Sequence, residues 1–267
     1  MSPRHFLAIF LAELRKTLLR GSGMAALGVA AAVGVLAVGG LAAARHLGGD
    51  AQVNGLPVDQ ILSFTGVTAF SWSLKARNFF LLPLLLLWAT GATFAGEYRE
   101  QTLRELLVRP VPRWAVLLAK LAALSVLSGL TLLVTALASG LPGAALFGVE
   151  GDWGAPALGY LASWASDLGL LALGVLASLL FRNVAGVVVG VVLFLALDLG
   201  LRLVLKLAGA LGLQAATRIA PFLPGEALSA WEGYDGGWDA ISFAGLGVLV
   251  LLCLGLATWR LLRLDVP

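Results

Sequence analysis

The stretch LLPLLLLWATGATFAGEYREQTLRELLVRPVPRWAVLLAKLAALSVL, residues 81–127, contains two apolar runs with a dense group of charges between them. The first run ends at Gly96, and the second begins at Trp114 and continues past the quoted stretch. A helix needs roughly 20 apolar residues to cross the hydrocarbon core of a bilayer. The pattern therefore predicts two membrane-spanning helices joined by a short charged segment. Its seven charged residues are Glu97, Arg99, Glu100, Arg104, Glu105, Arg109 and Arg113.

The composition of the whole chain extends this prediction to a polytopic membrane protein. Of the 267 residues, 60% are hydrophobic and 12% are charged, whereas soluble domains carry about 25% charged residues. The net charge of +3 is too small and too scattered to indicate nucleic-acid binding. We expect an all-α membrane protein with a single transmembrane domain over residues 1–267. Six spans are expected, near 24–44, 78–96, 117–139, 157–180, 184–203 and 240–259.

Three segments outside these spans are expected to form shorter helices. Residues 3–20 have apolar side chains on one side and charges, including Glu13, on another, which predicts an uncleaved amphipathic helix lying in the membrane interface. Residues 58–73 are apolar but too short to span, so an interfacial helix is expected there as well. Residues 207–231 are interrupted by Pro221 and Pro224, which predicts short broken helices before the last span, in a re-entrant or interfacial position.

The distribution of positive charge predicts how the chain is oriented. Six spans place both termini on one side of the membrane. If that side is the cytoplasm, twelve of the 18 Lys and Arg residues, including Lys120, lie on the cytoplasmic side, and six, including Arg77, lie on the outer side. Cytoplasmic segments of membrane proteins carry an excess of Lys and Arg. We therefore expect a multi-pass protein of the cytoplasmic (inner) membrane, with both termini and the charged segment in the cytoplasm.

The charged segment itself has the features of a short helix. Thr102 and Glu105 fit the S/T-x-x-E capping box, which predicts that a helix begins at Thr102. Glu100 precedes Arg104 by four residues, and Glu105 precedes Arg109 by the same interval. An acid four residues before a base is the favourable order for an ion pair on a helix.

The remaining residues of the segment give this helix an apolar stripe and an end. Leu103, Leu106 and Leu107 form the stripe. Pro110 ends the helix, because the residue before a proline is pushed away from helical geometry. Pro112 then suits the first turn of the next helix. Two interpretations follow: a solvated loop whose arginines set the topology, or a helix that docks its apolar stripe into the groove of a cytoplasmic partner.

The run from Gly96 to Lys120 resembles the signature of ABC-2 type permeases. In that family a Glu at the end of the second span is followed by Thr, Leu-x-x-Leu-Leu, Pro-Val-x-Arg and a Lys at the third span. Gln101 stands where the family usually has glycine. The segment from Leu179 to Asn183 is similar to the family's short inner turn between the fourth and fifth spans. The matching positions in the signature are Glu97, Thr102, Leu103, Leu106, Leu107, Pro110, Val111, Arg113 and Lys120.

The resemblance implies a transmembrane subunit of an ABC transporter, most simply an exporter. Two such subunits pair, as two copies or as paralogues, among membrane lipids. Each docks a coupling helix, here about residues 102–109, into a cytoplasmic ABC ATPase subunit that binds ATP and magnesium. An alternative is a non-transporting membrane anchor that docks a cytoplasmic protein. The implied docking residues are Glu97, Arg99, Glu100, Thr102, Leu103, Arg104, Glu105, Leu106, Leu107, Arg109 and Arg113.

The sequence predicts that this chain carries no ATPase site of its own. A P-loop requires the pattern G-x-x-x-x-G-K-[ST], in which a lysine follows a glycine. The chain contains four lysines, Lys16, Lys75, Lys120 and Lys206, and none of them follows a glycine. Zinc and haem sites need clustered ligands, and the two histidines, at positions 5 and 46, are far apart. We therefore expect no catalytic residues, metal or cofactor on this chain.

Asp167, Asp198 and Arg202 are ionisable residues within the predicted spans, where a charge costs at least a few kcal/mol. Asp198 precedes Arg202 by four residues, so the two side chains lie on one helical face and can pair. Asp167 has no such partner on its own helix, and we expect it to face the bundle interior or water. Two interpretations remain open for these residues: structural ion pairing, or the polar lining of a transport pathway.

Overall fold

The protein is a bundle of long helices. This is a computed structural model, and its long helices are α1 (Pro3–Leu19), α2 (Gly21–Leu47), α4 (Gly66–Phe79), α5 (Leu81–Arg99), α7 (Arg113–Phe147), α8 (Gly154–Phe181), α9 (Val184–Ala210) and α13 (Ala240–Leu262). Short elements are β1 (Gln52–Val53), β2 (Leu56–Pro57), α11 (Pro224–Leu228), the 3-10 helix η2 (Ala230–Glu232) and α12 (Gly233–Gly236). The structure describes residues 3–47, 52–53, 56–57, 63–99, 112–213, 218–219 and 222–263.

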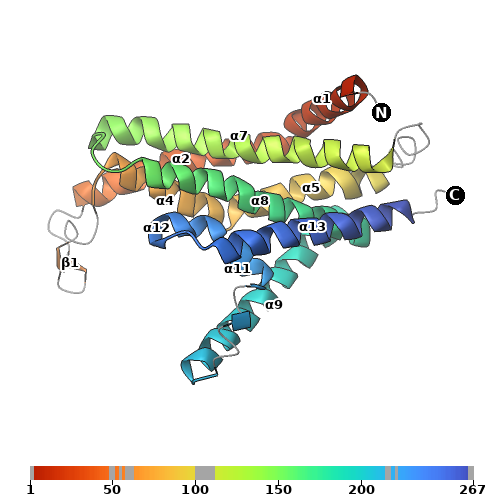
Figure 1. Ribbon diagram of the computed structural model, residues 1–267. Coiled ribbons are helices and arrows are strands. Elements are labelled where there is room, and N and C mark those ends of the chain that lie inside the picture. Colours follow the sequence, from red (N-terminus) through yellow and green to blue (C-terminus); the bar gives the residue numbers. More distant parts are fainter. Residues whose placement is uncertain are drawn as a thin grey trace.

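The arrangement is that of an all-α membrane protein. Within the described residues, five helices are long and apolar enough to cross a membrane, and the bent pair α4–α5 brings the number to six if it is one broken span. Figure 1 shows α2, α5, α7, α8 and α13 lying side by side, whereas α9 diverges from them. The strands β1 and β2 form a minimal antiparallel pair at one end of the bundle. The other end carries α1, the end of α5, the start of α7 and the end of α13 (Figure 1).

The third span is longer than the sequence suggested. It was expected near 117–139, and α7 extends from Arg113 to Phe147 with Pro142 inside it. At 1.5 Å per residue its 35 residues measure about 50 Å, whereas the hydrocarbon core is about 30 Å thick. The helix therefore continues beyond the core, and its first residue follows Pro112, which occupies the N-cap position.

The expectation of an interfacial helix over residues 58–73 was wrong for the described part of that segment. Residues 66–79 form α4, which packs against α2, α7 and α8 inside the bundle. Its buried residues include Phe70, Leu74 and Arg77. An apolar excess over a short run does not distinguish a helix lying in the interface from one buried among other helices, because both environments accept apolar side chains.

Pro83 accounts for the break between α4 and α5. Proline has no N–H group, and its ring clashes with the carbonyl four residues earlier, which is that of Phe79. The helix therefore ends there, Phe80 adopts non-helical angles (φ −156°, ψ −54°), and α5 begins at Leu81, bent by 47° from α4. This break positions Arg77 and Asn78 at the end of a helix inside the bundle.

The remaining connections follow local sequence signals. Between α8 and α9, Arg182 adopts the left-handed conformation (φ 55°), and the Asn183 side chain caps α9 by accepting a hydrogen bond from the Gly186 amide at 2.5 Å. Before the last span, α11, η2 and α12 are the expected short broken helices, with Pro224 in the first turn of α11. Asp239 then caps α13 by accepting from the Ile241 amide at 3.0 Å.

The N-terminal helix α1 turns its polar side toward the bundle. Glu13 and Thr17 are buried, while Leu7, Leu11 and Leu19 are more than half exposed. This orientation leaves the apolar stripe free to contact the acyl boundary of the membrane. The core of the bundle lies farther along, where Leu124 and Leu127 of α7 pack with leucines and small residues of α5, α8 and α13.

Candidate functional site

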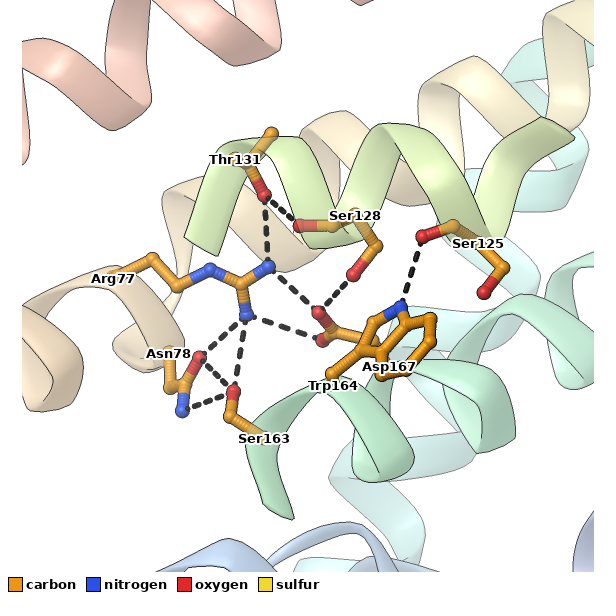
Figure 2. Close-up of polar contacts among 8 residues, drawn as sticks. All are labelled: Arg77, Asn78, Ser125, Ser128, Thr131, Ser163, Trp164 and Asp167. Atoms are coloured by element: carbon orange, nitrogen blue, oxygen red, sulfur yellow. Dashed lines mark hydrogen bonds and ion pairs between the residues drawn. The ribbon is translucent and has the colours of Figure 1, made fainter. Parts of the chain in front are cut away.

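An ion pair joins α4 to α8 in the interior of the bundle. The Nη1 and Nη2 atoms of Arg77 donate to the two carboxylate oxygens of Asp167 at 3.2 and 2.6 Å. Arg77 is fully buried and Asp167 is 5% exposed. The expectation that Asp167 faces the bundle interior agrees with this position. Figure 2 shows the two groups facing each other between the helices.

Helix α7 supplies two further partners of this pair. Ser128 donates to Asp167 Oδ2 at 2.5 Å, and Thr131 accepts from Arg77 Nη2 at 3.0 Å. On the other side, Nη1 donates to the Asn78 side-chain oxygen at 2.7 Å and to Ser163 Oγ at 3.3 Å. Three helices therefore meet at one polar cluster (Figure 2). Buried charges are tolerated when they are paired and their remaining hydrogen-bonding groups are satisfied.

A second buried network lies near the end of the bundle that carries both α1 and the start of α7. Lys120 Nζ donates to Glu13 Oε2 at 2.8 Å and to Glu97 Oε2 at 2.7 Å. Lys16 pairs with the other carboxylate oxygen of Glu97. The side chains of Lys120 and Glu97 are fully buried. Two acids and two bases thus neutralise one another at the junction of α1, α5 and α7.

The third ion pair includes the residues that the sequence placed on one face of α9. Arg202 Nε lies 2.9 Å from Asp198 Oδ2, so the i,i+4 pair is formed. Arg202 Nη1 also donates to Glu226 of α11 at 3.1 Å, and the Gly225 amide donates to Asp198 Oδ2 at 3.1 Å. These contacts connect the start of α11 to the C-terminal half of α9.

Most of the predicted docking residues lie outside the described part of the chain. Of the others, Arg99 is the last residue of α5, and Arg113 donates to the Leu261 carbonyl at 2.9 Å. Glu97 is fully buried and belongs to the ion-pair network, so in this structure its carboxylate faces the interior of the bundle instead of a docking surface. The residues outside the described part are Glu100, Thr102, Leu103, Arg104, Glu105, Leu106, Leu107 and Arg109.

Sequence reasoning missed several residues of these networks. Arg77 had been counted as a charge on the outer side and Lys120 as a charge on the cytoplasmic side, and the structure buries both. Glu13 was assigned to the polar face of an interfacial helix. A signal was present for two of them: Lys120 lies inside an apolar run, and Arg77 lies two residues before one. Partners 90 residues apart, as in the Arg77–Asp167 pair, leave no local pattern.

The three networks place paired charges inside the helical bundle. Within the described ranges, no group of three His, Cys, Asp or Glu residues is placed to hold a metal ion. The buried acids are each paired with a base, which favours structural or mechanical roles. Helix α7 contacts both networks: Ser128 and Thr131 follow Lys120 at about 12–16 Å along the helix axis at 1.5 Å per residue.

Comparison with known proteins identifies a family. A family model described as ABC-2 family transporter protein matches residues 13–200. No curated protein matches the chain in sequence. The family match covers most of the chain and includes the charged segment, both buried networks on α7 and Asp198. The chain is therefore a member of the ABC-2 transporter family.

Proposed function

We propose that this chain is the membrane subunit of an ABC exporter in the cytoplasmic membrane, driven by ATP hydrolysis on a separate ATPase subunit. Membership of the ABC-2 family supports a transmembrane subunit of an ABC transporter in general. In the proposal two such subunits pair, both termini lie in the cytoplasm, and residues 102–109 dock into the ATPase. ATP and magnesium bind to that partner.

The observation that carries the proposal is the ion-pair network at the base of the charged segment. Arg99 ends α5 and Arg113 begins α7, so the segment between them is attached to the bundle by these two helices. Lys120 of α7 holds Glu97 of α5 and Glu13 of α1 at 2.7 and 2.8 Å. A displacement of the segment would therefore move α1, α5 and α7 together.

Helix α7 then provides a path from the segment to the centre of the bundle. It carries Lys120 near one end and, farther along, Ser128 and Thr131, which contact the Arg77–Asp167 pair. A close-packed helix transmits displacement along its axis because protein interiors are nearly incompressible. In the proposal, closure of the ATPase subunits displaces α7, and this motion repositions α4 and α8 around the buried pair.

Co-purification tests the docking step. The chain is purified from its native host in mild detergent, and the bound ATPase is identified and its hydrolysis measured. Leu106→Asp should abolish co-purification for two reasons. Burial of a leucine is worth roughly 1.5–3 kcal/mol, and burial of an unpaired carboxylate adds a further cost. Thr102→Ala should weaken assembly by about 1 kcal/mol through loss of the helix cap.

The matched control is Leu211→Asp. Leu211 is 76% exposed at the far end of α9, so the same chemical change there should leave the ATPase bound. A size-exclusion profile reports folding of each variant. If Leu106→Asp retains the ATPase at the level of the unsubstituted chain, residues 102–109 are a connecting loop and the proposal fails.

A further inference from the structure

A two-chambered cavity lies where α5, α8 and α9 meet the short helices α11 and η2. The inner chamber, of about 260 Å³, is lined mainly by apolar side chains, among them Phe80, Leu84, Leu87, Leu170 and Val192. The outer chamber measures about 640 Å³. The chambers share the lining residues Asn78, Phe79, Leu195, Leu228 and Trp231, so they adjoin each other. Together they fall within the roughly 300–1,000 Å³ of ligand-binding sites.

The inner chamber contains an unused hydrogen-bonding group. Ser166 lines it and is 5% exposed. Its hydroxyl is buried and has no hydrogen-bond partner among the described residues. A buried polar group without a partner costs free energy, and a polar atom of a ligand would remove that cost. The neighbouring Asp167 also lines the chamber, but its charge is already balanced by Arg77.

The outer chamber differs from the inner one in its charges. Lys75, Arg202 and Glu232 line it. Arg202 is neutralised by Asp198 and Glu226. Glu232, in contrast, makes no hydrogen bond or ion pair through its side chain within the described part of the chain. Partial desolvation of this exposed side chain and the charge of Glu226 disfavour its ionised form and raise its pKa, and they outweigh the attraction of Arg202, Lys75 and Lys206.

Two aromatic rings line the same chamber as this carboxylate. Trp231 and Tyr234 stack with their ring centroids 6.4 Å apart. The protein already places one cation here, because Lys75 Nζ lies 5.9 Å from the centroid of the Tyr234 ring. Ring faces attract ammonium groups through their quadrupole, and a carboxylate beside them adds direct charge attraction. The surroundings of Glu232 therefore favour one further positive charge.

We propose that this cavity binds a cationic amphiphile, with its hydrocarbon part between α5, α8 and α9 and its ammonium group beside Glu232. The division of the cavity into an apolar and a charged chamber matches the two ends of such a molecule. Asn78, which accepts a hydrogen bond from Arg77 in the polar cluster, lines both chambers. That this ligand class is also the transported substrate rests on the proposed export function.

Probe binding to the purified chain tests the proposal without any ATPase. The probe is a fluorescent dodecyl trimethylammonium in a neutral maltoside detergent. A dodecyl sulfonate with the same fluorophore is the matched anionic probe. We expect the unsubstituted chain to bind the ammonium probe at least ten-fold more tightly than the sulfonate. Glu232→Gln should remove that preference, and Glu232→Asp should retain most of it.

Two further variants test whether the probes bind in the cavity or elsewhere on the protein surface. Leu195→Trp, at a position that lines both chambers, should weaken binding of both probes by filling the cavity. Glu150→Gln removes an exposed acid outside the cavity and should change neither affinity. The proposal is overturned if Glu232→Gln binds the ammonium probe as tightly as the unsubstituted chain, or if that chain binds both probes equally.

The docking variant distinguishes this proposal from the proposed export function. Leu106→Asp should bind the ammonium probe normally, because the substitution leaves every cavity-lining residue named above unchanged. Glu232→Gln should co-purify with the ATPase normally. Loss of probe binding with the ATPase retained therefore concerns the cavity alone, whereas loss of the ATPase with probe binding retained concerns docking alone.

Discussion

Arg77 and Asp167, which are 90 residues apart in the chain, form an ion pair 2.6 Å long in the interior of the bundle. The guanidinium comes from the last turn of α4 and the carboxylate from the middle of α8. Because α7 contributes hydrogen bonds to both groups, the pair fixes three helices relative to one another. Asp167 also lines the inner chamber of the two-chambered cavity.

The first prediction concerns this pair. Asp167→Asn leaves the Arg77 charge buried without a counter-charge, and breaking such a pair typically costs about 3–5 kcal/mol. The double variant with Arg77→Gln removes both charges, so its loss of stability should be smaller than the sum of the two single losses. Chemical unfolding in detergent, followed by tryptophan fluorescence, measures all three. Strictly additive losses in this double-mutant cycle would show that the two groups are not coupled.

The second prediction compares two lysines of the other network. Lys120 is fully buried between two acids, whereas the Lys16 side chain is 42% exposed. Lys120→Met should therefore cost about 3–5 kcal/mol, and Lys16→Met about 1 kcal/mol or less, as for an exposed ion pair. Thermal unfolding of the two variants measures the difference. Equal losses would contradict the assignment of Lys120 as the centre of the network.

The third prediction tests the contact between α9 and α11. A Cβ atom at Gly225 would collide with the Asp198 carboxylate and the Arg202 guanidinium. Gly225→Ala should therefore separate α11 from the ion pair and cost about 1–3 kcal/mol, as overpacking does. Gly200→Ala is the control, because its Cβ meets nothing within 4 Å and alanine is favoured over glycine in a helix. Unfolding measurements should show a loss for the first variant only.

The fourth prediction concerns pH and Glu232, whose pKa is raised above its ordinary value of 4.5 by partial desolvation and by Glu226. The folded chain then binds this proton more readily than the unfolded chain. The contribution of Glu232 to stability is therefore greatest below pH 4.5 and declines as the pH rises through the raised pKa. Relative to the unsubstituted chain, Glu232→Gln should become more stable as the pH rises through this window. Unfolding measurements across that pH range give the difference in stability between the two chains. If Glu232→Gln instead becomes less stable as the pH rises, the pKa of Glu232 is not raised.

The fifth prediction concerns orientation. If both termini are cytoplasmic, a reporter fused after Pro267 that matures only outside the cytoplasm should remain inactive, and one that works only in the cytoplasm should be active. The same two reporters inserted between α7 and α8, after Val149, should give the opposite result. Activity of the external reporter after Pro267 would show that the topology is inverted.

The sequence by itself determined the features that depend on residues close together in the chain. The length of an apolar run fixes whether a helix can cross a bilayer, so a multi-pass helical protein follows from composition and run length. Asp198 and Arg202 were paired correctly because four residues bring side chains onto one helical face. The turn around Asn183 and the broken segment at Pro224 likewise depend on local backbone chemistry.

Only the tertiary structure decided which charges are buried and with what partners. Arg77, Lys120 and Glu13 looked like interfacial charges, because the chain order says nothing about how each helix is rotated about its axis. That rotation is set by the packing of all the helices together, which turned Arg77 toward Asp167 and Lys120 toward Glu13, 107 residues away. The cavity likewise depends on the tertiary structure. It requires the break at Pro83, the divergence of α9 and the placement of η2, and no local stretch of sequence contains all three.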